Sequence, residues 1–167
     1  MKLSTIVDKI RELYYVSLPA SETELIKAYK RGVPKELLEL YKLGNGMFIG
    51  YDSYSDASES HNFRLEIPEL SKIQTVQSYG FVCEDAPLYN LTEKWWQFVD
   101  NGNGNWLAFD GNQEGYGRIL DIFHEEVGYE ECHGIIAESI TELLDQLVQR
   151  DGTDWFGNEE WQPLGYV

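Results

Sequence analysis

The sequence of 167 residues predicts a single domain of mixed type, with helices at both ends and antiparallel strands between them. Two observations lead to this fold class. Apolar residues recur at helical spacing in residues 1–42 and again in residues 139–149. Between these parts, the runs WWQFV, NWLAF and GRILDIF are rich in β-branched and aromatic residues, and the Asn/Gly-rich turns between them predict a meander. No repeat and no low-complexity linker divides the chain, so one core is expected for residues 1–167.

The N-terminal segment predicts a first helix. Ser4 belongs to the residue types that cap helices at their N-termini. The apolar residues that follow fall on one face of a helix, and we expect that face to be buried. They are Ile6, Ile10, Leu13 and Tyr14.

Two further helices are predicted next. The run SETELIKAYKRG opens with a capping box between Ser21 and Glu24 and ends at Gly32, which is a C-terminal signal. Pro34 suits the first position of a third helix, PKELLELYKLG, because its ring fixes φ and the missing N–H is not needed there. The buried side of this helix is expected to carry Leu37, Leu38, Leu40 and Tyr41.

The middle of the chain is expected to alternate strands with loops. Strands are predicted at residues 47–51 and at FRLEI, residues 63–67, where apolar and charged residues alternate. The polar segment 52–62 between them predicts a loop. Residues 68–80, PELSKIQTVQSYG, place apolar residues three apart and predict a helix, whereas residues 83–94 predict a loop.

The C-terminal part predicts one more helix and an aromatic tail. A second capping box, from Ser139 to Glu142, opens the helix SITELLDQLV. The acidic and aromatic tail of residues 151–167 is expected to pack back onto the domain. The helical stripe consists of Ile140, Leu143, Leu144 and Leu147, and the tail aromatics are Trp155, Phe156 and Trp161.

Charge is unevenly distributed along the chain. There are 13 Lys and Arg against 29 Asp and Glu, a net charge of −16. Residues 1–42 hold eight basic and six acidic residues, whereas residues 43–167 hold five and 23. Such a field repels phosphate backbones and anionic membranes, and it speeds encounter with a basic protein. We therefore expect a basic protein partner, no nucleic acid and no membrane; a role in solubility alone is the alternative interpretation.

The N-terminus and the cysteines indicate a cellular location. The run MKLSTIVDKIRELYY has charges every few residues and no long apolar stretch, unlike a signal peptide or a membrane span. Cys83 and Cys132 could pair, but two cysteines do not form a disulfide framework. A cytoplasmic location is expected by elimination.

Residues 110–121, DGNQEGYGRILD, are similar to the calcium loop of an EF-hand. Asp110, Asn112, Glu114 and Asp121 occupy ligand positions one, three, five and twelve. The flanking segments are of strand type, however, and position twelve carries Asp in place of the bidentate Glu. The DGN run instead suits a hairpin, because Gly and Asn accept positive φ. The sequence thus predicts a turn and no metal site.

No catalytic constellation is recognised in the sequence. His124-Glu125 begins like the zinc motif HExxH, but the fifth residue is Gly128. Cys132 and His133 are adjacent, which lacks the spacing of a structural zinc site and does not indicate a nucleophile–base pair. We therefore expect no enzyme activity, no cofactor and no metal. The alternative is a metal-dependent enzyme, whose ligands would be Asp110, Asn112, Asp121 or His124.

Three segments, taken in order, resemble the SUKH superfamily, which includes the fungal Smi/Knr cell-wall regulators and many bacterial toxin-immunity proteins. The first is ETELIKAYKRGVPKELLELYKLGNG, with a helix, a Gly-x-Pro turn, a second helix and an Asn-Gly ending. The second is GNGNWLAFD, a turn followed by a strand that closes on Asp. The third is IIAESITELLDQLV, a short strand followed by an apolar helix. Together they cover most of residues 20–150, although Val33 stands where the family usually has Leu.

The resemblance implies an α+β fold, in which N-terminal helices and a C-terminal helix pack on a mainly antiparallel, curved sheet. It also implies a protein without enzyme activity. Bacterial members of this kind resemble immunity proteins that bind and neutralise a cognate toxin, commonly a nuclease. An acidic inhibitor suits the basic surface that a nuclease presents to nucleic acid. The alternative is a regulatory or scaffold domain of the fungal Smi/Knr type.

Two loops combine aromatic anchors with acidic side chains and are the candidate partner-binding sites. In DIFHEEVGYEE, acidic residues surround one tyrosine without a nearby Lys or Arg. The run YDSYSDASES has a similar composition; ordinary solvated loops are the alternative interpretation of both. The candidates are Asp121, Glu125, Glu126, Tyr129, Glu130 and Glu131 in the first loop, and Asp52, Tyr54, Asp56 and Glu59 in the second, beside Tyr51.

Overall fold

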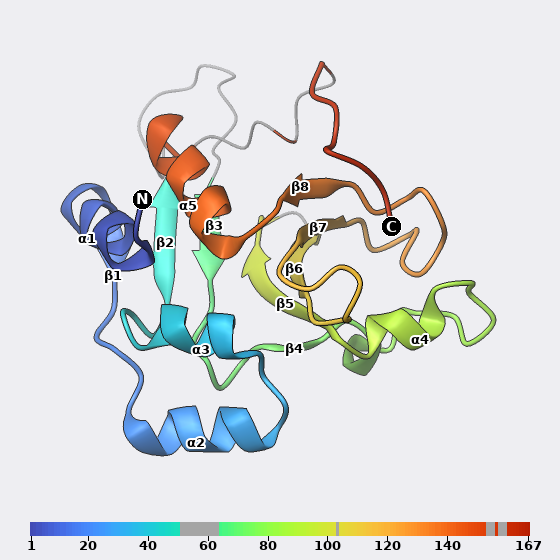
Figure 1. Ribbon diagram of the computed structural model, residues 1–167, viewed down its shortest axis with the longest axis horizontal. Coiled ribbons are helices and arrows are strands. Elements are labelled where there is room, and N and C mark those ends of the chain that lie inside the picture. The colour runs from blue at the N-terminus through green and yellow to red at the C-terminus, as the bar shows by residue number, and fades with distance from the viewer. Residues whose placement is uncertain (51–63, 103, 153–155, 157–159) are drawn as a thin grey trace.

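The computed structural model describes residues 1–50, 64–102, 104–152, 156 and 160–167. Within these residues, one eight-stranded antiparallel sheet extends through the domain, and most of the helices lie on one side of it (Figure 1). The strand order is β1-β2-β3-β5-β6-β7-β8, with β4 paired to β5. The α+β fold implied by the resemblance is therefore confirmed.

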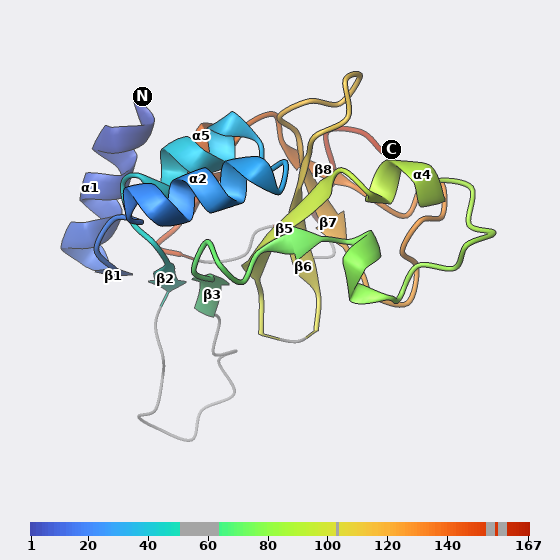
Figure 2. The ribbon, with the colours of Figure 1, turned by 90° about the horizontal axis from the view of Figure 1, so that it is seen from below.

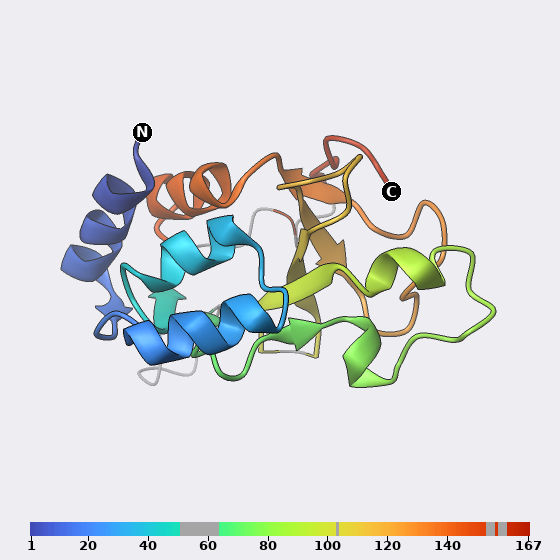
Figure 3. The same cartoon turned by 60° about the horizontal axis from the view of Figure 1, so that its bottom comes forward.

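Four helices form the layer on one face of the sheet: α1 (Leu3–Leu13), α2 (Glu22–Lys30), α3 (Lys35–Tyr41) and α5 (Ile140–Gln149). Figures 2 and 3 show them gathered together, with α1 packed beside α5. The predicted N-terminal and C-terminal helices are thus all present. None of the helices in the described part of the chain is long and apolar enough to cross a membrane.

The start of α1 differs from the prediction. The helix begins at Leu3, so Ser4 lies inside the first turn, and no side chain caps this end. The buried face is formed by Ile6, Val7 and Ile10, whereas Leu13 is exposed. The apolar spacing therefore predicted the helix correctly, but it placed one residue too many in the core.

The two predicted capping boxes form to different extents. At α2, Ser21 Oγ accepts the backbone N–H of Glu24 at 3.3 Å, and the Ser21 N–H donates to the Glu24 carboxylate at 2.8 Å. At α5, Ser139 Oγ accepts the N–H of Glu142 at 3.1 Å. The Glu142 carboxylate, however, accepts the N–H of Glu138 at 2.8 Å. The second box is therefore only half formed, because its glutamate reaches one residue further back.

The strands are short, and they alternate in direction. Their bounds are β1 (Tyr15–Val16), β2 (Met47–Gly50), β3 (Arg64–Ile67), β4 (Gln74–Thr75), β5 (Trp95–Asp100), β6 (Trp106–Asp110), β7 (Ile119–Ile122) and β8 (Ile135–Ala137). The predicted meander is confirmed, because β5, β6 and β7 pair in sequence order. The register of β5 against β6 shifts between Gln97 and Val99, which marks a β-bulge.

The sheet separates two apolar clusters. Trp96 and Phe109 point toward the four helices and belong to the larger cluster. Trp95 and Ala108 point to the opposite face, which is covered by loops and by the short helix α4 (Tyr89–Thr92). Because side chains alternate along a strand, the two adjacent tryptophans serve different cores. Helix α4 lies within residues 83–94, which were predicted to form a loop, so this loop contains one helical turn.

Residues 68–80, which were predicted to form a helix, do not form one. They contain turns, strand β4 and the 3₁₀-helix η1 (Gln77–Tyr79). Leu70, Ile73 and Val76 are buried all the same. Their spacing of three therefore reflects burial of the side chains in the core. The backbone of the segment is held by hydrogen bonds from other parts of the chain and not by those of a helix.

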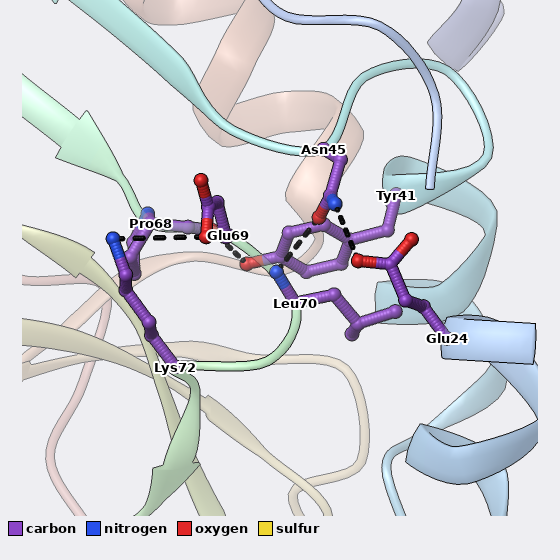
Figure 4. Close-up of polar contacts among 7 residues, drawn as sticks. All are labelled: Glu24, Tyr41, Asn45, Pro68, Glu69, Leu70 and Lys72. Atoms are coloured by element: carbon purple, nitrogen blue, oxygen red, sulfur yellow. Dashed lines mark hydrogen bonds and ion pairs between the residues drawn. The ribbon is translucent and has the colours of Figure 1, made fainter. Parts of the chain in front are cut away.

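Side chains from the helical layer hold the backbone of residues 68–73, which we call the tethered segment. Tyr41 Oη donates to the carbonyl of Pro68 at 2.9 Å, and Asn45 Oδ1 accepts the N–H of Leu70 at 2.8 Å (Figure 4). A helix over residues 68–80 would use the carbonyl of Pro68 in its own ladder, whereas here this carbonyl accepts from Tyr41.

Asn45 and Arg31 extend this attachment to α2. Asn45 Nδ2 donates to the carboxylate of Glu24 at 3.2 Å, so one amide joins the start of α2 to the tethered segment. Arg31, just after α2, donates to the carbonyls of Leu70 and Ile73 at 2.9 and 3.1 Å. The helices and the sheet are therefore linked by polar contacts as well as by the apolar core.

The C-terminal tail packs back onto the domain, as predicted. Leu164 donates its N–H to the carbonyl of Ile135 at 2.9 Å, so the tail lies along the edge of β8. Phe156 and Trp161 pack against the larger cluster, whereas Trp155 lies outside the described residues. The tail thereby covers backbone groups that an open strand edge would expose.

Replacing Asn45 with Ala tests the attachment. The N–H of Leu70 would lose its acceptor in a half-buried place, so the free energy of unfolding should fall by about 1–3 kcal/mol. Urea denaturation followed by tryptophan fluorescence measures the change. Asn90→Ala, at an exposed position in α4, is the matched control and should shift stability by less than about 0.5 kcal/mol. An Asn45→Ala protein as stable as the wild type would contradict the role assigned to this amide.

Candidate partner-binding surface

The first candidate loop connects β7 to β8 and spans residues 123–134; we call it the acidic loop. It contains no Lys or Arg. Tyr129 is 44% exposed, so its ring is accessible to a partner. Four carboxylates in this loop are exposed as well, those of Glu125, Glu126, Glu130 and Glu131.

The middle of the acidic loop is part of the core. Val127 is 3% exposed and packs in the smaller apolar cluster. Two turns flank it, in which Glu126 donates its N–H to Phe123 O at 3.1 Å and Tyr129 donates to Glu126 O at 3.2 Å. Gly128 is buried at a φ of +89°, a conformation that favours glycine. The exposed carboxylates are therefore carried by a backbone that the core holds in place.

His133 is fully buried and joins the two ends of the acidic loop. Its Nε2 accepts the N–H of Gly128 at 3.0 Å, and its Nδ1 lies 3.3 Å from the carbonyl oxygen of Asp121. Because a backbone N–H only donates, Nε2 must be unprotonated, and Nδ1–H then donates to Asp121. The ring also meets Trp95 edge-on, with centroids 4.9 Å apart. The neutral imidazole is thus the form that fits this site.

A second loop, residues 80–88, packs against the acidic loop at the same end of the molecule (Figures 1 and 3). Leu88 donates its N–H to the carbonyl of Gly128 at 2.9 Å. A Cβ added to Gly128 would lie 3.0 Å from an atom of this loop, so the two backbones approach closely. The loop exposes Glu84 and Asp85, which enlarge the acidic surface. Neither residue was predicted to belong to the site, because the run CEDAP does not indicate which other loop it contacts.

The other predicted site residues are Asp121 and those of the second candidate loop. Asp121 is half-buried within β7, and its N–H donates to Gly134 O at 2.9 Å. The structure therefore brings together the four glutamates and Tyr129 of the acidic loop, with Asp121 at its base. The second candidate loop falls outside the described residues: Tyr51, Asp52, Tyr54, Asp56 and Glu59.

The turn between β6 and β7 uses the carboxylate of Asp110 for its own structure. Asp110 is 3% exposed, and its Oδ1 accepts both the backbone N–H and the side-chain N–H of Asn112 at 2.8 Å. Gly117 donates its N–H back to Asp110 O at 2.9 Å, which closes the hairpin. The predicted turn is confirmed. Among the described residues, no group of three or more His, Cys, Asp or Glu could hold a metal ion.

The thiol of Cys132, within the acidic loop, is not activated. Partial burial raises the pKa of Cys132, and the carboxylate of Glu126 raises it further, so the nucleophilic thiolate is disfavoured. Both ring nitrogens of the adjacent His133 are already used by the backbone. Cys132 and Cys83 are both free thiols. These groups therefore lack the arrangement of a nucleophile with its base.

Comparison with known proteins gives two matches. The sequence model of the family described as SMI1 / KNR4 family (SUKH-1) matches residues 9–146, which include α2, α3, the sheet, the acidic loop and parts of α1 and α5. The chain is also similar to a protein of Bacillus subtilis (strain 168) named Immunity protein YokJ. The two are 24% identical over 127 residues, which cover 76% of this chain and 71% of the relative.

The pH dependence of stability tests the state of His133. Burial lowers the pKa of His133 below its ordinary value of 6.5, while the hydrogen bond to Asp121 and the charge of Glu126 partly oppose this. The unfolded chain therefore binds the proton first. The contribution to stability is complete above pH 6.5 and is lost as the pH falls toward the folded pKa.

The wild type should thus lose free energy of unfolding as the pH falls below about 6.5, by at most about 1.4 kcal/mol per pH unit from this group. His133→Gln should lose less over the same range, as measured by urea denaturation at a series of pH values. His124→Gln, at an exposed position, is the control and should keep the wild-type slope. Equal slopes in all three proteins would show that His133 is not the titrating group.

Proposed function

Since this chain belongs to the SMI1/KNR4 family (SUKH-1), we propose that it is an immunity protein that binds and neutralises a toxin protein. The similarity to a relative named as an immunity protein supports this role. The observation that carries the proposal is the acidic surface formed by the acidic loop and its neighbour, residues 80–88, on a backbone held by the core. The protein acts by binding, without a catalytic step, in the cytoplasm.

The charge of the chain favours a basic toxin. The net charge is −16, and residues 43–167 carry 23 of the 29 acidic residues. A nuclease must present a basic surface to its nucleic acid, and an acidic inhibitor can cover that surface in place of the phosphate backbone. Opposite charges also raise the association rate. The proposed partner is therefore a toxin with a basic surface, such as a nuclease.

The structure of the acidic loop suits this task. Its exposed carboxylates would steer the encounter, and the accessible ring of Tyr129 would slow dissociation. Because Val127 and His133 hold the backbone in the core, little of it has to be ordered on binding. A surface that is ordered in advance loses less conformational entropy when the complex forms.

Neutralising the acidic loop tests this assignment. The variant replaces Glu125, Glu126, Glu130 and Glu131 with Gln, and its binding to the proposed partner toxin is measured by stopped-flow at several salt concentrations. The association rate constant at low salt should fall at least about tenfold, and its dependence on salt should flatten. The thermal midpoint should change little, since all four side chains are exposed.

A matched control separates the local surface from the total charge. It replaces four exposed glutamates on α1, α2, α3 and the β6–β7 turn with Gln, so its net charge changes by the same amount. These residues are Glu12, Glu22, Glu39 and Glu114. The control should keep most of the wild-type rate. If both variants slowed association equally, the total charge and not the acidic loop would steer the toxin.

A further inference from the structure

A cleft of about 940 Å³ lies on the helical side of the sheet, between the turn from α2 to α3, the start of β5 and the β6–β7 turn. Figure 3 shows the turn from α2 to α3 beside β5. The cleft is basic, although the chain as a whole has a net charge of −16. Among the described residues, one acidic side chain lines it, that of Glu93, against four basic ones. We call it the basic cleft; its basic residues are Lys30, Arg31, Lys35 and Lys94.

The charges of these four side chains are not compensated locally. Within the described part of the chain, none of the four forms an ion pair with a carboxylate. Arg31 donates to the carbonyls of Leu70 and Ile73, which carry no net charge, and the three lysines are exposed. At physiological salt, charges further apart than about 8 Å are largely screened from one another. A group inside the cleft therefore responds mainly to these cations and little to the distant carboxylates of the chain.

An apolar hollow adjoins the basic cleft on the surface of α2 and α3. It measures about 270 Å³ and shares Tyr29 and Lys35 with the cleft, so the two are continuous. Leu25 and Leu38 line it, and Tyr29 is 62% exposed at its border. Pockets for drug-sized ligands measure about 300–1,000 Å³, so the hollow suits a single apolar side chain. The surface thus offers an apolar anchor point beside a group of cations.

The walls of the cleft are held in place by other parts of the fold. Gly111 donates its N–H to the carbonyl of Lys94 at 2.8 Å, and a Cβ at Gly111 would lie 2.8 Å from that oxygen. The hydroxyl of Tyr116 donates to the carboxylate of Glu36, and its ring meets Phe109 edge-on with centroids 5.5 Å apart. A surface that is already ordered loses less conformational entropy when a ligand binds.

The cleft and the hollow together select the ligand. Lysine side chains attract anionic groups as point charges, without demanding one fixed geometry. A duplex nucleic acid carries one negative charge about every 1.7 Å, and it would extend from the cleft over the acidic remainder of the surface, which repels it. A short acidic peptide keeps its charges within the cleft. Its apolar side chains also suit the hollow, which a phosphate backbone would leave empty.

We propose that the basic cleft and the adjoining hollow bind an acidic segment of a protein partner. Its carboxylates would lie on Lys30, Lys35 and Lys94, and one apolar side chain would enter the hollow between Leu25 and Leu38. Helices α2 and α3 lie away from the acidic loop (Figures 1 and 3), and the charge of the cleft is opposite to that of the loop. The inference therefore does not rest on the proposed function, and its test does not require the toxin.

The test is an NMR titration of the ¹⁵N-labelled protein with a short peptide, acetylated and amidated at its ends, that carries Leu at its centre and Glu or Asp at every other position. The backbone N–H resonances of Lys35, Gly111 and Tyr116 should shift saturably, with a Kd on the order of 0.1–1 mM. The peptide with Gln and Asn in place of Glu and Asp should bind at least about tenfold more weakly. The peptide with Ser in place of Leu should bind at least about fivefold more weakly.

A lysine variant locates the site. It combines Lys30→Gln, Lys35→Gln and Lys94→Gln, and it should bind the acidic peptide at least about tenfold more weakly than the wild type. Arg31 is kept, because its guanidinium holds the tethered segment. The matched control changes three exposed lysines outside the cleft to Gln and should keep the wild-type Kd within about twofold. The control positions are Lys2, Lys9 and Lys72. Both variants should keep the wild-type Tm, since all six side chains are exposed.

Four results would overturn the proposal. The first is no saturable shift with the acidic peptide, and the second is equal binding of the neutral peptide. The third is an equal loss of affinity in both lysine variants, which would assign the effect to total charge. The fourth is binding of a short oligothymidylate to the same residues at least as tightly as the peptide, which would identify a nucleic-acid surface instead.

Discussion

The hydrogen bonds from Tyr41, Asn45 and Arg31 to the backbone of the tethered segment join the helical layer to the sheet. Three of these bonds are accepted by the carbonyls of Pro68, Leu70 and Ile73, which a helix over residues 68–80 would use in its own ladder. Beyond the tethered segment the chain enters β4, which pairs with β5. One wall of a cavity beside β5 and β6 is built from this same stretch. A few partly buried polar contacts therefore act together with the apolar core in holding the helices on the sheet, and the segment that they hold borders the cavity.

The acidic loop is held on the same principle at the other end of the sheet. A single buried imidazole, His133, accepts from the turn at Gly128 and donates to β7, so the loop is fixed at its middle and at both ends. The acidic loop contains no Lys or Arg that could neutralise its carboxylates. The hydrogen bonds of His133 hold its backbone in place of such ion pairs. Binding residues on loops that a rigid scaffold positions are a common arrangement in proteins.

Much of the fold could be predicted from local sequence signals. The capping residue Ser21, the apolar stripe of the last helix and the Asn/Gly-rich turns each act over a few residues, and each prediction is confirmed. Residues 68–80 were predicted wrongly, because apolar residues three apart occur both on helices and in segments that follow a core. The burial of His133 and of Gln97 could not be predicted, since it depends on strands that are distant in sequence. The same holds for the contact of residues 80–88 with the acidic loop.

The central claim is that this protein neutralises a toxin by binding it. The most direct measurement is the survival of cells that express the proposed partner toxin, with and without this protein. The account predicts that co-expression restores growth and that the toxin co-purifies with the protein. Growth arrest that persists despite a well-expressed protein, together with recovery of chromosomal housekeeping proteins from its native host, would contradict the claim and favour a regulatory scaffold.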